Sequence, residues 1–195
     1  MSTTSAFNAQ AHPGASPAQA PKDAGNELLP IQRMSVKYEG LEDRIALDVA
    51  SAQGRVARLW LTRYGADTMV LATAALVESY ATVQLAKARV APSDAEHIRQ
   101  SALATQQLTA RLTKRNAPAV ELTPGSTEHL VIGFAVPPRK HGIQLVFVCR
   151  PEIKARVVLQ PAELFQWLGT VQPQYQRAGW ALDVWPAWLS QRPVQ

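Results

Sequence analysis

Basic and aromatic side chains on two short stretches carry the clearest binding chemistry in this sequence. Arg58 and Trp60 lie on the first stretch, and Lys154 and Arg156 lie on the second. Arginine beside tryptophan on an open sheet face can contact the phosphates and stack on the bases of single-stranded nucleic acid. The same residues also suit a solvated sheet face, or one that helices cover along the arginine stems. Nucleic-acid binding is therefore the alternative interpretation, not the leading one.

The C-terminal segment is the second candidate binding element, because it concentrates large apolar side chains. Four of the five tryptophans lie between positions 167 and 188. Such residues anchor protein interfaces, and they also fill cores. We expect a protein interface here, with packing on the chain's own domain as the alternative. The residues predicted for this interface are Leu182, Val184, Trp185, Trp188 and Leu189.

Catalytic and metal-binding patterns are missing from the sequence. The histidines His12, His97, His129 and His141 are scattered, without the i, i+4 spacing that clamps a metal on a helix. Neither a glycine-rich phosphate loop nor a Gly-x-Ser-x-Gly nucleophile elbow occurs. We therefore expect no enzyme, no metal and no cofactor; a small enzyme with an unrecognised site is a further alternative.

Cys149 is the only cysteine, so an internal disulfide and a cysteine-based zinc site are both excluded. It alternates with Ile143, Leu145 and Phe147 along a predicted strand. A thiol that shares a strand face with three large apolar residues is expected to be buried and unreactive.

Composition sets the broad class. The chain has 195 residues, 47% of them hydrophobic, and a formal net charge of +5, enough for one domain with a real core. Residues 1–27 are rich in Ala, Ser, Pro and Gln and are predicted to be a disordered leader, since they lack the apolar residues that would offset the entropy of ordering. The prediction is a single domain at residues 28–190, a tail at 191–195, a cytoplasmic location and no membrane contact.

Hydrophobic periodicity places the elements that must position these residues. Alternation predicts strands at residues 44–49, 55–62, 130–136, 143–149 and 153–159, while spacings of three and four predict helices at 67–87, 93–114 and from Pro161 to Gly179. A capping-box pattern at Ser93 and Glu96 marks the start of the second helix. The faces expected to be buried carry Met69, Ala72, Leu76, Tyr80 and Val83; Ile98, Ala102, Leu108 and Leu112; and Leu130, Ile132, Phe134 and Val136.

A weak internal repeat organises these elements. Residues 57–62 read Ala-Arg-Leu-Trp-Leu-Thr, and residues 155–160 read Ala-Arg-Val-Val-Leu-Gln. Each copy follows a predicted strand and precedes a predicted helix. The sequence therefore predicts an α+β fold with antiparallel sheet, built from two β-hairpin–helix units with a helical hairpin between them.

Two resemblances extend this interpretation. Residues 42–45 and 58–63 resemble a motif of uncharacterised bacterial proteins, which implies no particular function. The order of elements resembles the head domains of the eukaryotic end-joining scaffold and the centriolar cartwheel protein, although this chain has no long coiled coil after the head. Those heads dimerise or polymerise without catalysis. The leading prediction is a non-catalytic interaction, adaptor or assembly protein that acts through protein–protein contacts and self-associates.

Overall fold

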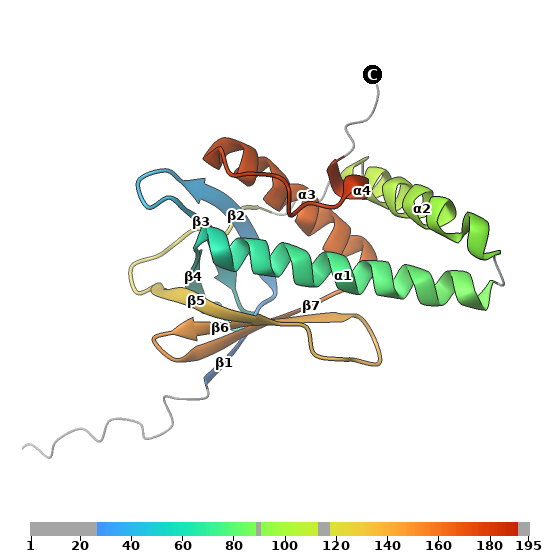
Figure 1. Cartoon of the computed structure of the whole chain (residues 1–195). Coiled ribbons are helices and arrows are strands. Elements are labelled where there is room, and N and C mark those ends of the chain that lie inside the picture. Colours follow the sequence, from blue (N-terminus) through green and yellow to red (C-terminus); the bar gives the residue numbers. More distant parts are fainter. Residues whose placement is uncertain (1–26, 89–90, 113–117, 191–195) are drawn as a thin grey trace, which may run out of the picture.

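The computed structural model describes residues 27–88, 91–112 and 118–190. The predicted leader and tail lie outside these residues, except that Glu27 is already the first residue of a strand. The fold is α+β, as predicted, with one curled sheet and helices packed against it (Figure 1).

The sheet has seven strands, in the order β1-β7-β6-β5-β4-β3-β2. Most neighbours are antiparallel, but β4 pairs with β5, and β1 with β7, in parallel. The segment that forms β1, where no strand was predicted, adds an edge strand beside β7. The strands are β1 (Glu27–Pro30), β2 (Arg33–Glu39), β3 (Arg44–Ala50), β4 (Val56–Leu61), β5 (Thr127–Ala135), β6 (Ile143–Arg150) and β7 (Ile153–Leu159).

The internal repeat corresponds to a repeated piece of structure. The first unit is the meander β2-β3-β4 followed by helix α1 (Arg63–Lys87), and the second is the meander β5-β6-β7 followed by helix α3 (Pro161–Ala178). The repeated residues occupy β4 and β7, the strands that lead into these helices. Helix α2 (Pro92–Leu112) returns from α1 to form the predicted helical hairpin, and a single turn, α4 (Ala187–Ser190), ends the described chain.

Helices α1 and α3 cover the same face of the sheet and share one core with it. The central strands supply Leu47, Leu59 and Phe147, all with no exposed surface. Helix α3 ends as predicted, because Gly179 adopts a φ of 64° and caps the helix in the left-handed region. The Gly179 amide N–H donates to the carbonyl oxygen of Gln176.

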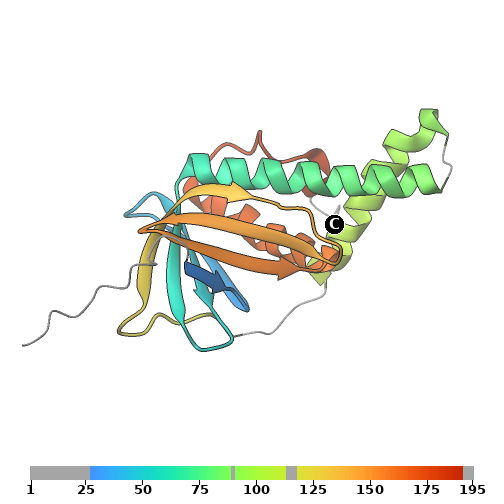
Figure 2. The same cartoon turned by 90° about the horizontal axis from the view of Figure 1, so that it is seen from below.

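The prediction of which side of α1 is buried is only half right. Met69 is buried, but Tyr80 is 59% exposed and Val83 is also exposed. Helix α1 begins four residues earlier than predicted, and its second half runs beyond the sheet toward the hairpin tip (Figure 2). The apolar residues of that half have no sheet beneath them, so periodicity alone could not tell which are covered.

Helix α2 also buries a different face from the predicted one. Ile98 and Leu108 are exposed, Ala102 is exposed too, and Leu103 is buried. The helix starts at Pro92, where the Ala91 carbonyl oxygen accepts the first amide bonds, and Glu96 accepts hydrogen bonds from Arg99 and Gln100. The fourth predicted position, Leu112, has no described side chain.

A β-bulge breaks the predicted alternation of β5. The register with β6 shifts between Val131 and Gly133, so Val131 is buried while Ile132 is 52% exposed. Phe134, beyond the bulge, returns to the core face and packs against Phe147 at 5.3 Å between ring centroids. A bulge changes which residues face the core without leaving a composition signal.

One helix among the described residues, α1, is long and apolar enough to cross a membrane by length and composition. The sequence prediction contained no such segment. Length and composition do not separate a membrane span from a helix of a soluble core, and α1 packs against β3, β4, β5 and α2.

Candidate functional site

The C-terminal strip that was predicted to form an interface packs on its own domain. Trp188 is 1% exposed, Leu189 is fully buried and Trp185 is buried, while Leu182 and Val184 are partly buried against the same core. The alternative left open by the sequence therefore describes this structure. These five residues offer no free apolar strip to a partner.

Specific contacts hold the strip in place. The Trp188 ring lies edge-on to Phe165 of α3 at 5.4 Å, and its indole N–H donates to Glu78 of α1 at 3.0 Å. Trp180 and Trp185 each meet Tyr175 edge-on at 5.2 Å. The strip thus links helix α1 to helix α3 through Trp188.

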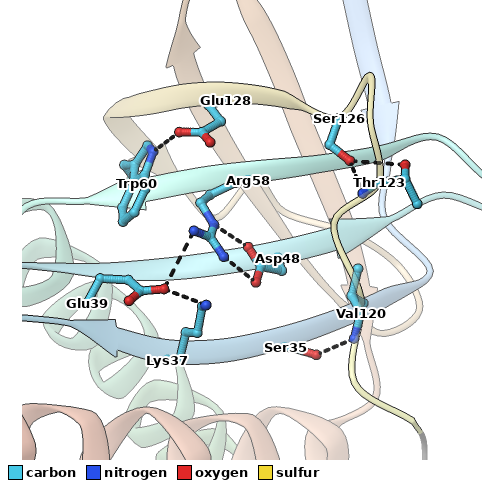
Figure 3. A network of polar contacts seen from close by, with 10 residues as sticks. All are labelled: Ser35, Lys37, Glu39, Asp48, Arg58, Trp60, Val120, Thr123, Ser126 and Glu128. Carbon is cyan, nitrogen blue, oxygen red and sulfur yellow. Dashed lines mark hydrogen bonds and ion pairs between the residues drawn. The ribbon is translucent and has the colours of Figure 1, made fainter. Parts of the chain in front are cut away.

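The second predicted site, around Arg58, is an internal network rather than a free basic surface (Figure 3). The Arg58 guanidinium donates to both carboxylate oxygens of Asp48, at 2.6 and 2.9 Å, and lies 3.5 Å from Glu39. It also sits 5.0 Å from the centre of the Trp60 ring, whose N–H donates to Glu128. The hydrogen bonds to Asp48 are the main reason that the pKa of Arg58 is raised.

This network weakens the case for nucleic acid. Arg58 and Arg156 do share the sheet face away from the helices, because on both strands the residues that alternate with them are buried in the core. Strands β5 and β6 lie between them, however, and the registers align Arg58 with Glu128 but Arg156, through Val146, with Ala135. The two arginines are therefore also offset by seven residues along β5. Three carboxylates surround Arg58 and Trp60, so a phosphate would have to displace them. Binding through Arg58, Trp60, Lys154 and Arg156 stays a prediction.

A cleft lies at the other end of the molecule, where the sequence indicated no site. Its volume is about 670 Å³, within the range of ligand-sized cavities. Helices α1 and α2, the loop between β5 and β6, and the start of α3 form its walls. Gly142 shapes the loop: its φ of 72° is in the left-handed region, and an added Cβ would lie 3.1 Å from the Leu159 carbonyl oxygen.

The predicted burial of Cys149 is confirmed. The thiol is 2% exposed, and burial raises its pKa to about 12. The sulfur lies 3.8 Å from the Phe147 carbonyl oxygen, as expected for a weak S–H donor. His129, also buried, is placed by Thr127 and the Pro151 carbonyl oxygen. No group of three or more His, Cys, Asp or Glu side chains that could hold a metal occurs among the described residues.

We expect the thiol pKa to make the protein sensitive to alkaline pH. A folded-state pKa near 12, above the ordinary 9.0, means that Cys149 contributes its full stability below pH 9 and loses it as pH rises toward 12. Cys149→Ala should cost about 1–2 kcal/mol at pH 7 through a small cavity. Between pH 8 and pH 10.5, the wild type should lose about 2 kcal/mol more than the variant.

Urea unfolding of both proteins at the two pH values measures this difference, and alkylation by iodoacetamide tests burial directly. The native thiol should react far more slowly than the thiol in urea. Equal pH-dependent losses in the two proteins, or rapid labelling of the native state, would contradict the burial of Cys149.

Comparisons with known proteins leave the geometry as the basis for function. No family model, no curated protein and no solved structure matches this chain.

The cleft could not be recognised from sequence because its walls are far apart in the chain. The basic turn at Arg139, Lys140 and His141 was visible, but nothing local places it opposite Tyr80 or Phe165. One signal was available in the sequence: the helical hairpin carries more apolar residues than a single buried face requires.

Proposed function

We propose that the protein is a non-catalytic assembly protein that self-associates through an exposed face of helix α1. The observation that carries the proposal is a stripe of seven exposed, uncharged residues, which we call the α1 face. Their spacings of three and four place them on one side of the helix. The α1 face consists of Tyr64, Thr68, Leu71, Ala75, Ser79, Thr82 and Ala86.

The polar groups of the α1 face are partly satisfied within the helix. The hydroxyl of Thr68 donates to the Tyr64 carbonyl oxygen, and that of Thr82 donates to the Glu78 carbonyl oxygen. A partner covering these two threonines would therefore bury methyl groups and no unpaired hydroxyl donor. The carboxylates of α1 lie off the stripe: Asp67 accepts a hydrogen bond from Tyr175, and Glu78 accepts one from Trp188.

A second copy of the chain is the partner that fits this face. In a two-fold symmetric dimer each surface meets itself, so any charge on the face meets its own like charge. The α1 face avoids that cost, and its small residues allow two helices to approach closely. Spacings of three and four are also those of helices that pack side by side over several turns.

Glutamates in the middle of the α1 face should abolish self-association. Leu71→Glu with Ala75→Glu places four carboxylates at a two-fold interface, and repulsion plus desolvation should weaken it by about a hundredfold or more. The same change of residue types at Leu41 and Ala52, which are exposed in turns, is the matched control. Light scattering over a concentration series measures the mass of each protein.

The expected result is a dimer for the wild type and the control and a monomer for the α1 variant, with unchanged circular dichroism. A wild type that stays monomeric at high concentration would sink the proposal. So would co-sedimentation of the wild type with lipid vesicles that the α1 variant loses, because the face would then belong to a bilayer.

A further inference from the structure

The cleft between the helical hairpin and the start of α3 combines an apolar floor with basic walls. The floor comes from three elements that also build the core, through Val77 on α1, Leu103 on α2 and Phe165 on α3. Leu103 is 2% and Phe165 3% exposed, so the floor is anchored and does not depend on an occupant for its shape. By helix geometry, the α1 residues that line the cleft lie on the side of α1 opposite the α1 face.

Charge distinguishes this cleft from an ordinary surface groove. Among the described residues, its lining includes Arg99, Arg139, Lys140 and His141 but no Asp or Glu. The basic groups come from two separate walls, Arg99 from helix α2 and the other three from the loop between β5 and β6. An occupant therefore meets positive charge on two sides of an apolar floor.

The polar contacts of the arginines leave capacity for an acidic partner. Arg99 donates through Nη2 to Glu96, but its Nε is buried without a hydrogen-bond partner among the described residues. The Arg99–Glu96 pair is exposed on the Glu96 side, so its net stabilisation is small and a carboxylate of a partner can replace it. Arg139 donates to a neutral acceptor, Gln144.

We propose that this cleft binds an acidic, amphipathic segment of a partner protein, with apolar side chains on the floor and carboxylates toward the two basic walls. A fatty acid or single-headed lipid would need cationic groups at one end only, whereas here they flank the floor. Helices that lay an apolar face in a groove bind in this way. The proposal does not rest on self-association, because the α1 face lies on the other side of the helix.

Selection from an unbiased peptide library tests the chemistry of the occupant. The full chain is panned against random peptides about 16 residues long, enough for roughly four helical turns. Enriched peptides should combine apolar residues at helical spacing with Asp and Glu, and fluorescence anisotropy of the best one should show binding that weakens with salt.

Charge reversal at the rim then places the peptide in the cleft. Arg139→Glu with Lys140→Glu should weaken binding at least roughly tenfold through repulsion. Arg33→Glu with Arg150→Glu makes the same change of net charge at exposed positions outside the cleft and should weaken it less than about threefold. Both positions in each variant are exposed, so folding should be unaffected, as circular dichroism checks.

Three outcomes would overturn the proposal. The panning could enrich no peptide, or enrich peptides without acidic residues. The two double variants could weaken binding equally, which would show long-range charge and not the cleft. Finally, anionic vesicles could bind the wild type and displace the peptide, which would assign the basic walls to a lipid surface.

Discussion

Trp188→Ala is expected to destabilise the domain by about 4 kcal/mol, a large part of the 5–15 kcal/mol of a typical domain. The substitution removes a side chain that is 1% exposed, together with its edge-on contact to Phe165. It also leaves the Glu78 carboxylate without the indole donor. Because Trp188 contacts both α3 and α1, its removal opens a cavity between these two helices. Urea unfolding followed by circular dichroism measures the loss.

Two further variants separate the causes. Trp188→Phe keeps most of the ring and should cost roughly half as much, while Leu41→Ala, at a fully exposed position, should cost less than about 0.5 kcal/mol. Truncation after Asp183 removes Trp185, Trp188 and Leu189 together and should leave a chain that does not fold. A truncated chain that folds with wild-type stability would show that the strip is dispensable to the core and would reopen its role as an interface.

The C-terminal strip shows where sequence reasoning reaches its limit. Aromatic density indicated that the segment is covered, but the same apolar area serves an interface and a core. The choice depends on whether α1 and α3 leave room for Trp188, and that is a property of tertiary packing. The repeat fared better, because strand alternation and Gly179 are local signals that predicted β4, β7 and the end of α3.

Helix α1 and strand β5 illustrate two further causes of error. Nearly every position of α1 is apolar or small, so the pattern of residues could not fix which side faces the sheet. In β5 the bulge near Val131 and Gly133 exchanged the faces without any change in composition. The error in α1 concealed the exposed residues on which the proposed self-association rests.

Asp48→Asn is expected to cost about 2–3 kcal/mol, because it removes the charge that compensates a largely buried guanidinium. The Arg58 side chain is 12% exposed and that of Asp48 is 7% exposed. After the substitution only Glu39, at 3.5 Å, and the face of Trp60 still compensate Arg58. The free energy of unfolding in urea at neutral pH is the measurement.

A double-mutant cycle shows whether the two residues act as a pair. Arg58→Met alone should also be costly, since it leaves the Asp48 carboxylate buried and unpaired. The double variant should then lose less than the sum of the single losses, by roughly 1–3 kcal/mol. Additive losses, or a loss below about 1 kcal/mol for Asp48→Asn, would mean that the pair is loosely held.

The same variant decides the remaining role of the sheet face. If Asp48 and Glu39 already pair with the Arg58 guanidinium, Arg58 should not contribute to any electrophoretic mobility shift of single-stranded DNA or RNA by the wild type at low salt. Asp48→Asn should then be the form that gains binding, because it frees a cation beside Trp60. Binding by the wild type that Arg58→Met abolishes would show instead that phosphate displaces both carboxylates. The nucleic-acid alternative would then regain the residue on which it depends.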